Sequence, residues 1–139
     1  MLIHASCAAR HGSGVLLTGA PGSGKSDLVL RLLDHGFALV ADDQVEVVDG
    51  VASPPASLAG LLEVRGLGIV RLPFEADVPL ALVAVLGSGA RLPAPARHAL
   101  GLPVVMIDPT RASAPARLGL ALECALGRVR QLAGAFVPC

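Results

Sequence analysis

The sequence predicts an α/β fold in which a glycine-rich loop joins a strand to a helix, and three observations support this prediction. The loop, residues 19–26, follows the apolar, strand-type run 15–18. The segment after it, 27–35, has apolar residues at helical spacing and is followed by Gly36, a residue type that commonly ends helices. Short apolar runs of strand type recur at 37–41, 78–86 and 104–107. Strands that alternate with helical segments are typical of an α/β domain.

Composition indicates a single globular domain and argues against one class of partner. The 139 residues are 53% hydrophobic and 16% charged, with no Trp or Tyr and a formal net charge of zero. Length and hydrophobic content predict one domain over residues 1–139 with a well-developed core. Because the chain lacks both a basic field and aromatic stacking platforms, we expect no nucleic-acid partner.

The cysteines and the hydropathy pattern indicate a cytoplasmic protein. Cys7, Cys124 and Cys139 are odd in number and form no C-x-x-C pair, so we interpret them as reduced thiols. The N-terminal residues lack the charged start and the long apolar stretch of a signal peptide. The longest apolar run, 80–86, is too short to cross a bilayer, which predicts a buried strand and no membrane contact.

The opening segments carry little signal of their own. A weak alternation over 2–6 predicts a first strand, and 10–14 is interpreted as a turn into the strand before the loop. His4 within the first segment is typical of an ordinary edge residue when it is considered alone.

The loop itself, Gly19-Ala20-Pro21-Gly22-Ser23-Gly24-Lys25-Ser26, fits the pattern G-x-x-x-x-G-K-[ST] at every fixed position. Glycines let backbone N–H groups approach phosphate oxygens, and a helix N-terminus adds a partial positive charge at the same point. Lys25 can then reach the terminal phosphates, and the Ser26 hydroxyl can ligate a magnesium ion. The alternative is a glycine-rich turn that only matches the pattern. The flanking strand and helix favour a site for a nucleoside triphosphate or a similar polyphosphate.

Two adjacent aspartates, Asp42 and Asp43, follow the apolar run 37–41. An acidic residue at the carboxyl end of a strand neighbouring the phosphate loop points at the bound metal, and open α/β sheets bind ligands at that edge. The two carboxylates can divide the work, one acting on magnesium and the other on a proton. The alternative is that the pair simply opens a turn.

Glu63 and Arg65 are charged residues in an apolar context, followed by two glycines. A buried pair between them would be a poor source of stability. A carboxylate and a guanidinium beside a triphosphate, in contrast, can act on the metal and on the transferred phosphate.

The remaining segments are predicted from turn and helix signals. Asp49-Gly50 between 44–48 and 51–52 predicts a hairpin. We also expect a short helix or turn at 56–62 and strands at 69–72, 78–86 and 104–107. The residues 87–98, which include Arg91 and Arg97, are expected to form a loop. The last expected element is a helix that starts at the N-cap Ser113, carries Arg117 and ends near Leu132, with Val129 and Leu132 on its apolar face.

Taken together, these residues resemble the catalytic domain of HPr kinase/phosphorylase. The resemblance covers His4, the loop 19–26, the run Leu39-Val-Ala-Asp42-Asp43 and the run Leu62-Glu-Val-Arg-Gly-Leu-Gly-Ile69, and it is looser after residue 72. It implies an α/β fold with the phosphate loop on a mixed β-sheet flanked by helices, related to phosphoenolpyruvate carboxykinase. It also implies an ATP- and Mg²⁺-dependent serine kinase that acts on the phosphocarrier protein HPr, with reverse phosphorolysis in many members and a hexameric homo-oligomer.

The resemblance also implies a role for each candidate residue. The implied roles are phosphate binding by Gly19 to Ser26 and by His4, magnesium binding by Ser26, Asp43 and Glu63, proton transfer by Asp42 as general base, and phosphoryl transfer with Lys25 and Arg65. Three arginines, Arg91, Arg97 and Arg117, are candidates for a flexible basic loop that the family carries.

Compared with the family pattern, we expect two departures: no counterpart of the family's N-terminal domain, and a C-terminal extension that stops at Pro138-Cys139. We therefore expect the catalytic domain alone. Two other functions stay open: a kinase for a small molecule, and a non-catalytic nucleotide sensor. A GTP-dependent switch is disfavoured because the chain has no N-K-x-D segment.

Overall fold

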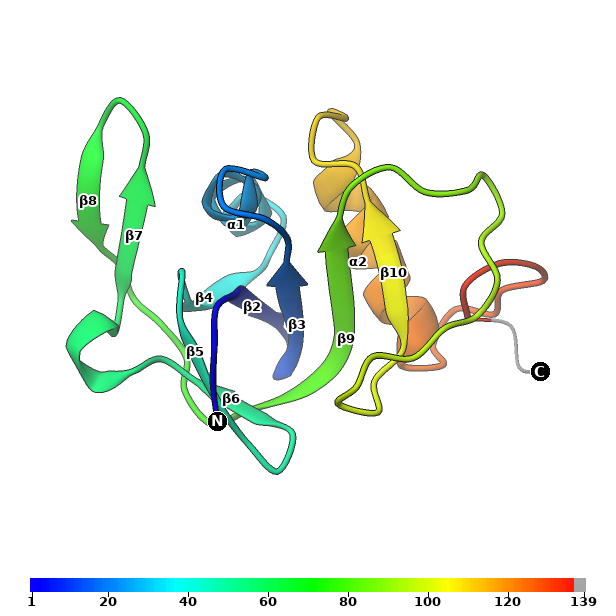
Figure 1. Ribbon diagram of the computed structural model, residues 1–139, viewed down its shortest axis with the longest axis horizontal. Coiled ribbons are helices and arrows are strands. Elements are labelled where there is room, and N and C mark those ends of the chain that lie inside the picture. Colours follow the sequence, from blue (N-terminus) through cyan, green and yellow to red (C-terminus); the bar gives the residue numbers. More distant parts are fainter. Residues whose placement is uncertain (137–139) are drawn as a thin grey trace.

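The structure, a computed structural model, describes residues 1–136 as a large mixed β-sheet with two α-helices and a separate β-hairpin (Figure 1). In chain order the elements are β1 (Leu2–Ile3), β2 (Ser6–Arg10), β3 (Ser13–Thr18), α1 (Lys25–Leu33), β4 (Ala38–Ala41), β5 (Val45–Val48), β6 (Val51–Ser53), the 3-10 helix η1 (Ala56–Leu58), β7 (Leu61–Val64), β8 (Gly68–Arg71), β9 (Val78–Leu86), β10 (Val104–Ile107) and α2 (Ala114–Ala125). Pro138 and Cys139, where the C-terminal extension is expected to stop, lie outside the described residues.

The large sheet has eight strands in the order β1-β5-β6-β9-β3-β2-β4, with β10 paired to the far part of β9. Strand β3 is parallel to β9, and β9 is parallel to β10, so the carboxyl ends of these three strands lie at one edge. Strand β2 is antiparallel to both β3 and β4. Strand β4 therefore runs in the same direction as β3, and the segment after β4 reaches the same edge as the loop after β3.

Both faces of the sheet are buried, but the helices cover only one of them. Leu28, Val29 and Leu32 of α1 share a core cluster with Leu118 and Leu122 of α2. The opposite face forms a second cluster beneath the strands β1, β5 and β6, which contains Leu16 and Val40. The expected mixed sheet with helices is confirmed, with the difference that strands replace a helix layer on the second face.

The predicted hairpin between 44–48 and 51–52 is confirmed as β5–β6. Asp49 and Gly50 at its turn have φ angles of 50° and 75°, which is why an Asp-Gly pair suits this position.

The opening strand predicted over 2–6 is confirmed only at Leu2–Ile3 (β1), because the chain turns at His4 and then enters β2. The segment 10–14 is largely strand, and only His11 and Gly12, at φ 52° and 79°, make the turn into β3. Strand β2 escaped detection because its residues, Ser-Cys-Ala-Ala-Arg, are small and carry little strand propensity.

The last helix, α2, ends earlier than predicted. Gly127, at φ 75°, accepts the left-handed conformation, and the Arg128 amide donates to the Glu123 carbonyl, which closes the helix end. Leu132, expected on the buried face, is 83% exposed. At the other end Ser113 occupies the N-cap position, but its hydroxyl accepts a bond from Arg117 Nε and does not cap the backbone.

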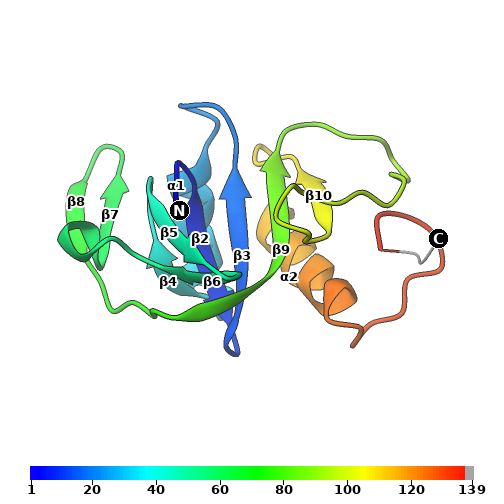
Figure 2. The same cartoon turned by 60° about the horizontal axis from the view of Figure 1, so that its bottom comes forward.

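Strands β7 and β8 form a two-stranded sheet of their own that stands at one end of the molecule, beside α1 (Figures 1 and 2). Leu62 is buried and faces the helix-side core, whereas Leu67 and Ile69 near the hairpin tip are 74% and 70% exposed. The hairpin thus adds one wall beside the loop after β3 and leaves its tip in solvent.

Candidate active site

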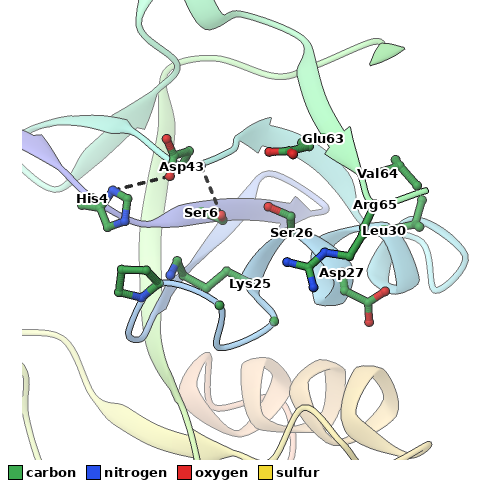
Figure 3. Close-up of a pocket in the computed structure, with 13 residues that line it drawn as sticks. His4, Ser6, Lys25, Ser26, Asp27, Leu30, Asp43, Glu63, Val64 and Arg65 are labelled. Atoms are coloured by element: carbon green, nitrogen blue, oxygen red, sulfur yellow. Dashed lines mark hydrogen bonds and ion pairs between the residues drawn. The ribbon is translucent and has the colours of Figure 1, made fainter. Parts of the chain in front are cut away.

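A cleft of about 590 Å³ opens at the carboxyl end of β3, between the glycine-rich loop, α1 and the β7–β8 hairpin (Figure 3). Besides glycines and Pro21 of the loop, its lining includes the predicted site residues His4, Lys25, Ser26, Asp43, Glu63 and Arg65. These residues come from four separate segments, so the fold brings together residues that are far apart in the sequence. Asp42 lies beneath the cleft and is not part of its lining.

The glycine-rich loop forms the floor of the cleft and leads directly into α1. Gly22 and Gly24 line the cleft at φ 79° and 101°, a conformation that side chains strongly disfavour. A Cβ atom on Gly19 would lie 2.6 Å from Ser23 Oγ, so a side chain there would not fit. Helix α1 has no side-chain cap at Gly24, which leaves its N-terminal amides for a ligand. Lys25 is 8% exposed, and its ammonium donates to the carbonyls of Gly19 and Ala20 at 2.9 and 3.1 Å.

Asp42 directly follows β4 and is held by two serine hydroxyls. Ser26 Oγ donates to its carboxylate, at 2.8 Å from Oδ1 and 3.0 Å from Oδ2, and Ser6 Oγ donates to Oδ1 at 2.8 Å. Strand β4 does not pair with β3, the strand before the loop, because β2 lies between them. Asp42 still reaches Ser26, since β3 and β4 point the same way and the first turn of α1 returns over the start of β2.

Asp43 has a different environment from Asp42. Its side chain is 66% exposed, faces the cleft, and lies 3.5 Å from His4 Nδ1 through Oδ1. Its backbone is in the left-handed region at φ 70°, which is uncommon for a non-glycine residue. The Ser26 hydroxyl therefore contacts Asp42, and the carboxylate of Asp43 is left facing His4 and solvent.

Glu63 and Arg65 stand on the opposite wall, at the end of β7. Both are exposed, and no ion pair joins them in the part of the chain that the structure describes. A buried structural pair, one alternative for these residues, is therefore wrong. Figure 3 shows the two side chains reaching from the hairpin toward Ser26 and Asp43.

The donor set of the cleft suits a hard cation only in part. Ser26, Asp43 and Glu63 offer oxygen atoms, the ligand type that Mg²⁺ prefers. Within residues 1–136, however, no three His, Cys, Asp or Glu side chains lie close enough to form a metal cage. This fits a magnesium ion held by one or two protein oxygens together with phosphate and water, the usual arrangement for this ion.

Of the three arginines expected near the site, two share a second cavity and one does not. Arg91 and Arg117 line a cavity of about 400 Å³ beyond the ends of β9 and β10, together with Arg111, which the sequence analysis missed. Asp108 is the acidic member of this lining, and the hydrogen bonds from Thr110, with Arg111 nearby, lower the pKa of its carboxyl group. Arg97 lies apart and donates to the Gly101 carbonyl at 3.0 Å.

The segment that lines one side of the second cavity also contacts helix α1 and the glycine-rich loop. Arg31 of α1 donates to the carbonyls of Pro109 and Arg111 at 2.7 and 3.3 Å. A Cβ atom on Gly24 would lie 3.6 Å from Pro109. The segment 108–111 thus packs between the two cavities.

Comparison with known proteins identifies relatives of the first half of the chain. The HPr Serine kinase C-terminal domain matches residues 1–74. HPr kinase/phosphorylases of Clostridium tetani and Listeria innocua are 46% identical over 67 residues, which is 45% of this chain and 22% of theirs. The chain therefore spans about a fifth of the length of these curated relatives.

A solved structure extends the likeness into the second half of the chain. The Hpr(Ser) kinase/phosphatase from Coxiella burnetii superposes with a TM-score of 0.69 at 26% identity, covering 91% of this chain and 88% of that one. Since the domain match takes in more than half of the chain, the protein belongs to the HPr serine kinase C-terminal domain family.

Proposed function

We propose that this chain transfers the γ-phosphoryl group of ATP to a serine hydroxyl of the phosphocarrier protein HPr, and that it can run the reverse phosphorolysis. Proteins of this family generally use ATP and Mg²⁺. The proposal rests on one observation: Lys25, Ser26, Asp43, Glu63 and Arg65 all line the same cleft. A relation of the fold to phosphoenolpyruvate carboxykinase, and assembly into a hexamer, remain predictions.

The cleft suggests how the work is divided among its residues. The loop amides and Lys25 bind the β- and γ-phosphates, and Arg65 approaches the transferred group from the opposite wall. A magnesium ion, when bound, neutralises charge on the phosphate oxygens, and Ser26 with Glu63 would hold it. His4 lies within reach of Asp43 and would orient that carboxylate or contact the phosphate.

For the two aspartates we propose the reverse of the roles that the resemblance implies. Asp42 is buried under Ser26, so it would orient the metal-binding hydroxyl, as a Walker-type aspartate does. Asp43 is exposed in the cleft, so its carboxylate is the one that can reach the acceptor hydroxyl and take its proton.

The test is phosphoryl transfer from γ-labelled ATP to purified HPr, compared with HPr whose target serine is replaced by alanine. Label on the first and none on the second supports the proposal. Label in a pool of small metabolites, with none on HPr, would indicate a small-molecule kinase. Tight ATP binding without transfer to any acceptor would indicate a nucleotide sensor.

A further inference from the structure

Three consecutive residues, His4, Ala5 and Ser6, each hold a different group of Asp43. His4 Nδ1 lies 3.5 Å from the carboxylate, and the Ala5 amide donates to the Asp43 carbonyl at 3.1 Å. The Ser6 hydroxyl accepts a hydrogen bond from the Asp43 amide at 3.3 Å. The residues from His4 to Ser6, the first residue of β2, thus contact the side chain, carbonyl and amide of the residue that we propose as proton acceptor.

Ser6 has a second partner in the same site. Its hydroxyl is completely buried and donates its proton to Asp42 Oδ1 at 2.8 Å, the atom that also receives the Ser26 hydroxyl. One oxygen atom therefore connects the carboxylate beneath the metal-binding serine with the backbone of the proton acceptor. Figure 3 marks the bond between Ser6 and Asp43 with a dashed line.

We propose that Ser6 is a positioning residue for phosphoryl transfer. Its hydroxyl fixes Asp43 in the left-handed conformation and holds the Asp43 backbone in a fixed position relative to the Asp42 carboxylate. This inference rests on the function proposed above. A non-glycine residue at φ 70° is uncommon, and the contacts around it help to maintain that conformation. Small displacements of a catalytic group lower the rate strongly, because transfer requires close alignment. The role of Ser6 is therefore to hold Asp43 where an acceptor hydroxyl can reach it.

The chain contains a matched control pair away from the cleft. Ser53 Oγ accepts a hydrogen bond from the Asp77 amide at 2.8 Å and donates to the Asp77 carboxylate at 3.2 Å. Asp77 is likewise left-handed, at φ 54°. Ser53→Ala removes the same kind of bond from the same kind of residue, but neither member of the pair lines the cleft.

The first measurement needs no activity: amide hydrogen exchange of Asp43, read by NMR on the full chain. We expect Ser6→Ala to accelerate exchange at Asp43 by about tenfold or more, because the amide loses its acceptor. Ser6→Thr, which keeps the hydroxyl, should leave exchange near the parent value, and Ser53→Ala should accelerate exchange only at Asp77. Unchanged Asp43 exchange in Ser6→Ala would overturn the inference.

The second measurement separates positioning from general damage. With HPr as acceptor, Ser6→Ala should lower kcat by roughly 10- to 100-fold, and any rise in the KM for ATP should be smaller than this loss, while Ser6→Thr restores kcat and Ser53→Ala leaves it unchanged. Faster Asp43 exchange with an unaltered kcat would overturn the positioning role. A loss of kcat in Ser6→Thr equal to that in Ser6→Ala would also overturn the positioning role. So would an effect of Ser6→Ala that is confined to the KM for ATP.

Failure of the proposed function would give different results from failure of the role proposed for Ser6. If the parent chain transfers nothing to HPr, the exchange arm still decides whether Ser6 holds Asp43. In that case the coupling of Ser6 to the Asp42–Ser26 pair is read from ATP affinity with and without Mg²⁺. We expect Mg²⁺ to strengthen ATP binding less in Ser6→Ala than in Ser6→Thr; equal strengthening, or none in any variant, would overturn the coupling.

Discussion

At the scale of single residues, the two neighbouring aspartates differ in backbone conformation, burial and partners, and this difference can be tested by isosteric substitution. Asp43→Asn keeps a residue type that tolerates the left-handed region but removes the proton-accepting charge. We expect kcat to fall by roughly 100-fold or more with ATP affinity preserved.

Asp42→Asn should act differently, because it changes the partner of the Ser26 hydroxyl. We expect the strengthening of ATP binding by Mg²⁺ to fall by roughly tenfold, measured by calorimetry with and without the ion. If Asp42→Asn instead left Mg²⁺-dependent binding intact and abolished transfer, the roles of the two aspartates would have to be exchanged.

Lys25 offers a second test at this scale because it is the only lysine in the sequence. Apart from the N-terminal amine, an amine-directed acylating reagent therefore has one target. ATP bound in the loop would occupy the ammonium group, so we expect MgATP to slow acylation of Lys25 by about tenfold or more, by mass action on a bound site. Peptide mass spectrometry measures this, and the exposed N-terminal amine is the internal control. Equal rates with and without MgATP would argue against Lys25 as a phosphate ligand.

The residue scale also shows why sequence predicts some site members and not others. The loop 19–26 is recognisable because its spacing is local and each position has a separate requirement. Ser6 carries no such pattern; it acts through partners 36 residues away that only the pairing of β2 with β4 brings near. Which aspartate faces the cleft depends on the left-handed turn at Asp43, and a polar pair at a strand end does not reveal this conformation.

At the scale of elements, Arg10 links the end of β2 to α2. Its guanidinium donates to the Gly119 carbonyl at 2.9 Å and to Glu123 at 3.2 Å, and it lies 4.9 Å from the centroid of the Phe37 ring. A Cβ atom on Gly119 would lie 2.7 Å from Arg10 Nη1. A side chain on Gly119 would have to displace the Arg10 guanidinium from these contacts, in a helix interior where glycine alone is unfavourable.

A double-mutant cycle tests this link. Gly119→Ala in the parent should destabilise the fold by about 1–2 kcal/mol, since the strained contact outweighs the gain of up to about 1 kcal/mol in helix propensity. In an Arg10→Ala background the same substitution should become stabilising. Urea denaturation measures both, and equal effects in the two backgrounds would contradict the contact.

The loop between β9 and β10 carries the second prediction at this scale. Arg91 lines the cavity tied to the phosphate loop, whereas Arg97 is bonded within its own loop. If the cavity receives an anionic group during transfer or phosphorolysis, Arg91→Ala should lower kcat/KM for HPr or phospho-HPr by roughly tenfold or more. Arg97→Ala is the matched control and should have little effect. Equal losses in the two variants would remove the distinction between these arginines.

Element boundaries were predictable where a local signal exists and not elsewhere. The Asp49-Gly50 turn and the apolar run of β9 could be located from sequence. The end of α2 could not, because Gly127 stops a helix whose apolar spacing continues into Val129 and Leu132. The isolation of β7–β8 is likewise a tertiary feature, since the sequence of a hairpin does not tell which sheet it joins.

At the scale of the whole molecule, the central strands β2 and β3 separate two cores, so their side chains are shielded from solvent on both faces. Neither helix within residues 1–136 is long and apolar enough to cross a bilayer. Cys7, in β2, is fully buried between Leu16 and Ala41 on the adjoining strands. Burial raises the pKa of its thiol from 9.0 to about 12.

This shift links global stability to alkaline pH. The folded state holds the Cys7 thiol protonated, whereas the unfolded chain ionises it near pH 9, so its contribution is complete below pH 9 and is lost as the pH rises toward 12. The free energy of unfolding should therefore fall across this window by up to about 1.4 kcal/mol per pH unit from this one group. Cys7→Ala should remove that part of the slope, measured by urea denaturation at several pH values. Cys124→Ala, which removes a half-buried thiol on α2, should leave the fall in the free energy of unfolding between pH 9 and 12 as it is in the parent protein. If the Cys7→Ala and parent curves ran parallel from pH 9 to 12, the thiol would have to ionise within the folded protein, and the two-sided burial of β2 would not be the barrier that the structure implies.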